Sequence, residues 1–251
     1  MTDALIFLAP GYEEVEMLTV VDMVRRAGLT IDMVSITDSL EVTSSHNVTI
    51  KADKLFKDAD FDSAKMIILP GGIPGTPNLL AFKPLTDKIL EFKENGKLLS
   101  AVCAAPTVYG ELGILKENKA TCYPGMEAKL NCAKHLEEPV VIDGQFTTSR
   151  GMGTCIEFAG AIIERLKDKE TAEDVKAKIV YNINSAREKV LFLNFWHICQ
   201  KHCHKNVRYG KNGSFFLQSP SGVIIILLLC VMRGARELEE KCPVTVLIQK
   251  I

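Results

Sequence analysis

Cys103 is the residue of this sequence best placed to act as a nucleophile. It stands in the run SAVCAAP (100–106), where a short apolar strand is expected to pass directly into a helix. A side chain on such a turn projects above the sheet, and the helix N-terminus would stabilise a thiolate there. The pattern allows two interpretations, because most free cysteines are small buried hydrophobic residues rather than reactive thiols.

Two glycines could supply the second part of such a site. Gly71 and Gly72 follow the apolar run KMIIL (65–69), which predicts another strand. Because glycine has no Cβ, its backbone N–H can approach a reacting group closely and stabilise a developing oxyanion. An ordinary turn is the alternative interpretation of this pair.

The predicted elements that position these residues alternate between strand and helix. Strands are expected over 4–9, 29–36, 65–69 and 98–102, and residues 140–149 predict a hairpin that turns at Asp143-Gly144. Helical spacing predicts helices over 13–27, 79–95, 104–112, 154–166 and 171–180. This alternation favours an α/β fold with a mainly parallel sheet, in which reactive groups collect at the carboxyl ends of the strands.

Composition excludes several classes of partner. The 251 residues carry 30 basic and 31 acidic side chains, so no basic excess favours nucleic-acid binding. Apolar runs stay shorter than the 18 or more residues that a membrane-spanning helix requires, and we expect no membrane partner. The N-terminus carries Asp3 and no basic region, so a secretory signal is not expected. The eight cysteines then favour a reducing, cytoplasmic compartment.

The sequence resembles the DJ-1 branch of the ThiJ/PfpI superfamily over about residues 3–183. The resemblance is carried, in order and with the family's spacing, by EEVE (13–16), DMVRRAG (22–28), LPGG (69–72), AVCAAP (101–106) and TSRGMGT (148–154). It implies a flavodoxin-like three-layer sandwich with a mainly parallel sheet and a nucleophile elbow. It also implies a homodimer formed through the first helix and neighbouring strands.

The resemblance also implies roles for individual residues. Cys103 would be the nucleophile, Glu16 the carboxyl group that contacts its sulfur, and the Gly72 and Ala104 amides the oxyanion-binding groups, with Gly71 beside them. An ionised Glu16 would repel a thiolate, whereas a protonated Glu16 would donate a hydrogen bond to it. Without the resemblance, Glu16 would be taken for a solvated charge on an amphipathic helix.

Two departures from the family pattern concern the base. The DJ-1 branch usually has Thr-x-His-Pro near the thiol, where this chain has TCYP (121–124), so Tyr123 replaces the histidine. A phenol is no imidazole-like base at neutral pH, but Tyr123 could position a carbonyl. The peptidase branch has a histidine directly after the cysteine, where this chain has Ala104, which makes peptidase activity the least favoured reading. His46 stands where the family has a basic side chain that helps to bridge subunits, and His135 lies in no matching motif.

The function implied by the resemblance is that of a cofactor-independent cysteine enzyme, a hydro-lyase or hydrolase, acting on reactive dicarbonyls. The expected activity is of the glyoxalase III type, or a deglycase activity on methylglyoxal, glyoxal and early glycation adducts. The alternative is a redox-sensing, chaperone-like stress protein with an oxidisable Cys103. Neither function requires a cofactor or a metal ion.

The other cysteines of the first 189 residues are expected to pack rather than react. Cys122 is either a resolving thiol for an oxidised Cys103 or, as we favour, a small packing residue. Cys132 and Cys155 have no partner at a spacing typical of metal sites.

Residues 190–251 differ in composition from the rest of the chain. They carry eight basic and three acidic side chains, against 22 and 28 in residues 1–189. HICQKHCH (197–204) is rich in potential zinc ligands but fits no standard spacing, and VIIILLLCVM (223–232) is short for a membrane span. We therefore predict a family domain over 1–187 and a poorly ordered non-family extension over 188–251, which an incorrect gene model could also explain.

Overall fold

The chain divides into two units, Met1–Tyr181 and Asn182–Ile251. The computed structural model describes residues 1–181, 207–209, 215–218 and 224–227. In the second unit, β12 (Val207–Tyr209), β13 (Phe215–Gln218) and β14 (Ile224–Leu227) form an antiparallel sheet. Part of the apolar run 223–232 is therefore a strand. The His/Cys-rich segment 197–204 lies outside the described residues, as does most of the predicted extension.

The first unit is built on a seven-stranded sheet in the order β10-β11-β7-β6-β1-β2-β5. Every neighbouring pair is parallel except the β10–β11 hairpin. This confirms the predicted α/β class, the mainly parallel sheet and the hairpin. The strands are β1 (Ala4–Leu8), β2 (Ile31–Ser35), β5 (Lys54–Leu55), β6 (Met66–Leu69), β7 (Leu98–Val102), β10 (Val140–Asp143) and β11 (Phe146–Ser149).

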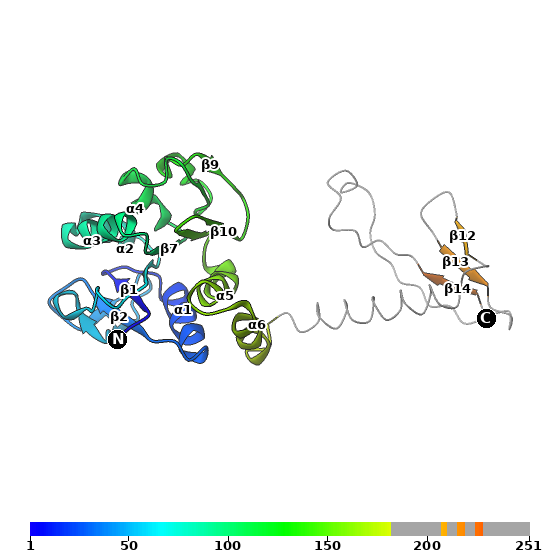
Figure 1. Ribbon diagram of the computed structural model, residues 1–251, viewed down its shortest axis with the longest axis horizontal. Helices are drawn as coiled ribbons and strands as arrows, with labels where there is room; N and C mark the ends of the chain where they lie inside the picture. Colours follow the sequence, from blue (N-terminus) through cyan, green and yellow to red (C-terminus); the bar gives the residue numbers. More distant parts are fainter. Residues whose placement is uncertain (182–206, 210–214, 219–223, 228–251) are drawn as a thin grey trace. The chain divides into compact units, whose positions relative to one another are not determined.

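Helices cover both faces of this sheet, which gives the three layers of a flavodoxin-like fold (Figure 1). One face packs against α1 (Glu14–Arg26) and α5 (Cys155–Leu166), with α6 (Lys169–Lys178) beside α5. The other face packs against α2 (Gly75–Ala81), α3 (Lys83–Glu94) and α4 (Pro106–Glu111).

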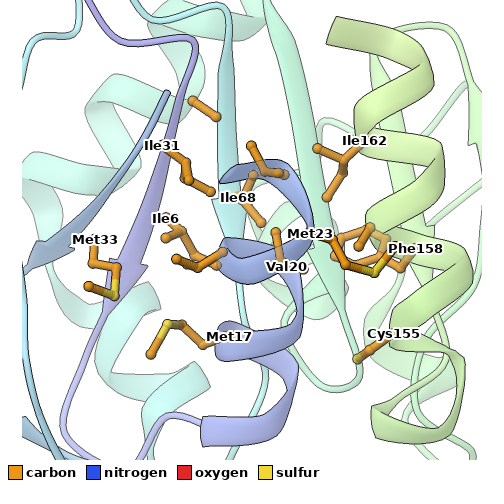
Figure 2. Close-up of a cluster of buried hydrophobic side chains, with 14 of the residues drawn as sticks. Ile6, Met17, Val20, Met23, Ile31, Met33, Ile68, Cys155, Phe158 and Ile162 are labelled. Atoms are coloured by element: carbon orange, nitrogen blue, oxygen red, sulfur yellow. The ribbon is translucent and has the colours of Figure 1, made fainter. Parts of the chain in front are cut away.

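The two cores follow from the alternation of side chains along β1. Ile6 belongs to the cluster under α1 and α5, whereas its neighbours Leu5 and Phe7 belong to the cluster on the opposite face. Figure 2 shows Val20 of α1 and Phe158 of α5 turned toward the same cluster. Burying each such side chain contributes about 1.5–3 kcal/mol, so the sheet and the start of α1 are held firmly together.

The prediction of a single continuous helix over 79–95 is wrong, because two helices, α2 and α3, meet at Phe82. Pro84 explains the break. It lacks a backbone N–H, and its ring would clash with the carbonyl of Leu80 if the helix continued, whereas a proline is tolerated in a first helical turn. The backbone of Phe82 accordingly leaves the helical region, with φ −82° and ψ 89°.

Several short elements have no counterpart in the sequence analysis. They include the edge strand β5, the hairpin of β3 (Glu41–Thr43) and β4 (Thr49–Lys51), the parallel pair β8 (Lys119–Ala120) and β9 (Lys134–His135), and the 3₁₀ turns η1 (Phe56–Asp58), η2 (Glu127–Lys129) and η3 (Met152–Thr154). Two or three residues are too few to show a periodicity. Among the helices of the described residues, none has the length and apolar character needed to cross a membrane.

Candidate active site

Cys103 lies between the end of β7 and the start of α4, as a nucleophile elbow requires. Its backbone is left-handed, with φ +62°, a conformation that costs a non-glycine residue of the order of 1–3 kcal/mol. Two hydrogen bonds hold it there. The Cys103 N–H donates to the Ser149 carbonyl at 2.9 Å, and the Tyr123 N–H donates to the Cys103 carbonyl at 2.7 Å. The end of β11 and the loop at Tyr123 therefore fix the position of the thiol, which is half-buried.

Glu16 lies in the first turn of α1 and is 1% exposed. Its carboxyl group is hydrogen-bonded to the Cys103 side chain, and the Gly71 N–H donates to Glu16 Oε2 at 2.8 Å. Only glycine fits at position 71, because a Cβ there would lie 2.6 Å from the Cys103 Cβ and 2.7 Å from Glu16 Oε2. The contact expected between Glu16 and the sulfur is therefore present in the structure.

Two backbone N–H groups also reach the sulfur of Cys103. They belong to Ala104, on the elbow, and to Gly72, on the loop after β6. Gly72 has φ +97°, and a Cβ there would lie 2.5 Å from the backbone N of Glu13. The structure thus brings Gly72 and Ala104 together around Cys103, as the family resemblance implies, and their action on a reacting oxyanion stays a prediction.

The carboxyl and the thiol each disfavour the ionisation of the other. Burial raises the pKa of Glu16 to about 7. Burial, and after it the negative charge of Glu16, raises the pKa of Cys103 to about 12, although the Ala104 and Gly72 amides lower it. Between these values the pair holds one proton. The helix N-terminus alone therefore does not lower the thiol pKa, because burial and Glu16 outweigh the amides. A thiolate forms here when Glu16 carries the proton.

Tyr123 and His46, the two residues named as possible accessory groups, have different partners in the structure. The Tyr123 side chain is half exposed. Its ring lies near Gly151, since an added Cβ there would be 3.6 Å from the ring. The backbone N–H of Tyr123 donates to the Cys103 carbonyl. The backbone of Tyr123 therefore helps to position the elbow, whereas a role of its phenol in positioning a carbonyl stays a prediction. His46, in the exposed β3–β4 turn, instead pairs with Glu14, its Nδ1 being 3.1 Å from a carboxylate oxygen.

The remaining described cysteines are free thiols. Cys122 and Cys155 are buried, and their sulfurs donate to the Tyr123 and Gly151 carbonyls, each at 3.4 Å. Burial raises the pKa of both thiols, which suits packing residues. Cys132 is half-buried. A resolving role for Cys122 stays an untested alternative.

One group of side chains has the composition of a metal site. Glu13, Glu14 and His46 each offer a ligand atom within 4.8 Å of the others. Their polar atoms already have protein partners, however. Glu13 accepts a hydrogen bond from the Glu16 N–H, and Glu14 pairs with His46. The cluster is therefore explained without a bound ion.

Fold and site together define an α/β protein centred on a half-buried cysteine in contact with a buried carboxyl group. A profile of the DJ-1/PfpI family matches residues 2–165, and the chain belongs to that family. Among its relatives, Protein DJ-1 homolog B of Arabidopsis thaliana is 37% identical over 186 residues, which cover 73% of this chain and 42% of the relative. This chain thus spans less than half of that longer protein.

In two further comparisons, the matched residues cover 90% or more of the protein that is compared with this chain. A Caenorhabditis elegans relative named glutathione-independent glyoxalase DJR-1.2 is 34% identical over 171 residues, which are 66% of this chain and 90% of the relative. The solved structure of oxidized Toxoplasma gondii DJ-1 superposes with a TM-score of 0.70 at 33% identity and covers 72% of this chain and 100% of that one. The family therefore includes a protein named as an enzyme and one solved in an oxidized form.

Proposed function

We propose that this protein is a cofactor-independent cysteine enzyme that converts reactive dicarbonyls such as methylglyoxal into hydroxy acids. The observation that carries the proposal is the contact between the buried Glu16 carboxyl and the Cys103 sulfur, in front of two backbone N–H donors. A nucleophile, a group that can accept and return a proton near neutral pH, and oxyanion donors are the parts this reaction needs. The name of the C. elegans relative points to the same chemistry.

The reaction would proceed through a thiohemiacetal. The Cys103 sulfur bonds to the aldehyde carbon, and the Gly72 and Ala104 amides hold the resulting oxyanion. Glu16 first gives the proton it carries to the neighbouring ketone oxygen. As a carboxylate it then takes the proton from the first carbon and delivers it to the neighbouring carbon, so that the ketone becomes an alcohol and the oxyanion carbon becomes the carbonyl of a thioester. Water cleaves the thioester C–S bond, which releases the hydroxy acid and restores the thiol. One water is consumed, and no external oxidant or reductant is needed.

Lactate formation from methylglyoxal tests this proposal. We expect turnover by the wild-type protein, and its loss by about 1,000-fold or more in Cys103→Ser, because a serine hydroxyl is far less acidic than a thiol and the Glu16 carboxylate is too weak a base to activate it. Cys122→Ser is the matched control and should retain turnover. A wild-type protein that forms no lactate, or a Cys103→Ser variant that forms it at the wild-type rate, would contradict the proposal.

A second candidate function is redox sensing. The groups that face the Cys103 sulfur, the Glu16 carboxyl and two amides, would also hydrogen-bond the oxygens of an oxidised sulfur. Peroxide titration with mass spectrometry would favour this function if Cys103 were oxidised to a sulfinate at peroxide concentrations that leave the other thiols intact, while dicarbonyl turnover stayed at background.

A further inference from the structure

Glu13, which the proposed mechanism does not use, closes a ring of three hydrogen bonds with Gly71 and Glu16. The Glu13 N–H donates to the Gly71 carbonyl at 3.0 Å. The Gly71 N–H donates to Glu16 Oε2 at 2.8 Å, and the Glu16 N–H donates to Glu13 Oε2 at 2.6 Å. The ring ties the start of α1 to the loop after β6, two segments more than 50 residues apart in sequence.

Each bond of this ring constrains the next. The Glu13 carboxylate acts as the N-cap of α1, with extended backbone at φ −89° and ψ 117°. The same residue holds Gly71 through its backbone, and Gly71 in turn holds the Glu16 carboxyl beside Cys103. A long, rotatable glutamate side chain is thereby kept in one position within the buried site.

The charge of Glu13 acts on the same carboxyl. A negative charge close to Glu16 opposes its ionisation, and Glu13 accordingly raises the pKa of Glu16, after the larger effect of burial. The other titratable groups around Glu16 are the Cys103 thiol and, from α5, the Cys155 thiol, which both Glu16 and Glu13 affect. Glu14 is turned to His46 instead.

We propose that Glu13 is a positioning residue for this site: its carboxylate holds Glu16 against Cys103, and its charge favours the form in which Glu16 carries the shared proton. That form is the one in which Cys103 is a thiolate. The inference deepens the proposed function and rests on it for its catalytic meaning, but the effect on the thiol can be measured without any substrate.

The test compares three variants by the rate at which iodoacetamide alkylates Cys103 between pH 5 and 10, followed by mass spectrometry of that peptide. Glu13→Gln keeps a cap oxygen and removes the charge, whereas Glu13→Ala removes both. Glu14→Gln removes an adjacent charge outside the ring and is the matched control. Lactate formation is measured in parallel.

We expect Glu13→Gln to slow alkylation at pH 7 by about threefold to tenfold, since a shift of one pKa unit changes the thiolate population tenfold. Its alkylation profile should also move to higher pH, because Glu16 then ionises more readily and the thiol keeps the proton. Glu13→Ala should be slower still, and Glu14→Gln should stay within about twofold of wild type. Glu13→Gln is the decisive variant if Glu13→Ala fails to fold.

The proposal is overturned if Glu13→Gln alkylates at the wild-type rate or faster, or if Glu14→Gln slows alkylation equally. If alkylation changes as expected but the wild-type protein forms no lactate, the positioning role stands and the proposed function fails. The two outcomes are therefore distinguishable.

Discussion

The Cys103 thiol and the Glu16 carboxyl are in contact, so the charge of each residue depends on the other. Replacing either one changes the acidity of its partner as well as removing a functional group. Reactivity of the sulfur and turnover of a substrate should therefore respond differently to the same substitution. A thiol reagent needs only a thiolate, whereas the proposed isomerisation also needs the proton that Glu16 moves.

Glu16→Gln should separate these two properties. A neutral amide no longer opposes ionisation of the sulfur, so we expect alkylation of Cys103 at pH 7 to accelerate about tenfold or more. Lactate formation should fall by at least about 100-fold, because glutamine cannot shuttle a proton. Iodoacetamide kinetics and a lactate assay on the same preparation measure both. Parallel loss of alkylation and turnover would contradict the assignment of Glu16.

The raised pKa of Glu16 also predicts how stability depends on pH. In the folded protein this pKa rises from its ordinary value of 4.5 to about 7, so folding favours the protonated carboxyl. The contribution is present below pH 4.5 and is lost as pH rises through 7, by up to about 3 kcal/mol. Denaturant unfolding of wild type and Glu16→Gln at pH 5 and pH 8 measures it. The variant should gain stability relative to wild type at pH 8, and an equal difference at both pH values would refute the prediction.

At the scale of elements, apolar runs and turn residues were sufficient to predict β1, β6, β7 and the β10–β11 hairpin. They were insufficient for the break at Phe82, where Pro84 overrides a continuous helical pattern. The burial of Glu16 could have been predicted from the sequence, because Glu16 precedes Val20 by one helical turn and so falls on the apolar face of α1. The ring through Glu13 and Gly71 could not, because Gly71 is more than 50 residues from Glu13 and takes part through backbone groups alone.

Gly71→Ala should disable the site without unfolding its elements. The new Cβ would lie 2.6 Å from the Cys103 Cβ and 2.7 Å from Glu16 Oε2, so the carboxyl and the thiol must separate. We expect lactate formation to fall by about 100-fold or more, as misplacement of reacting groups by about 1 Å does. Gly153→Ala, where a Cβ meets no atom within 4 Å, is the control. Equal activity of the two variants would contradict the conclusion that the missing side chain of Gly71 lets the Glu16 carboxyl and the Cys103 thiol meet.

At the scale of the whole molecule, the expected homodimer stays a prediction that the exposed surface supports. On α1, Val15 and Leu18 are 44% and 42% exposed, and Val48 of the β3–β4 turn is 43% exposed. The Glu14–His46 pair links these two elements, so the three apolar side chains belong to neighbouring parts of the surface. Light scattering at micromolar concentration should show a dimer of the wild type and more monomer in Leu18→Glu. A monomeric wild type would contradict the prediction.

The residues of the candidate site all belong to the unit Met1–Tyr181. We therefore expect removal of residues 190–251 to leave lactate formation within about threefold of the full chain, since a domain of this size can complete its own core. Thermal melts and turnover of the two proteins, with and without a chelator, measure this. A much lower melting temperature of the shortened chain, or loss of activity of the full chain in the chelator, would show that the extension contributes.

The left-handed backbone at Cys103 lowers the stability of the fold, although the reactive thiol has to stand at this position. Glycine adopts φ +62° without a steric penalty, whereas cysteine retains that penalty in every folded molecule. A library screened for thermostability alone would therefore face no pressure to keep the thiol and some pressure to lose it. A screen that also demands reactivity of the sulfur would retain cysteine and would have to find its gains in stability elsewhere, in the two cores on either side of the sheet.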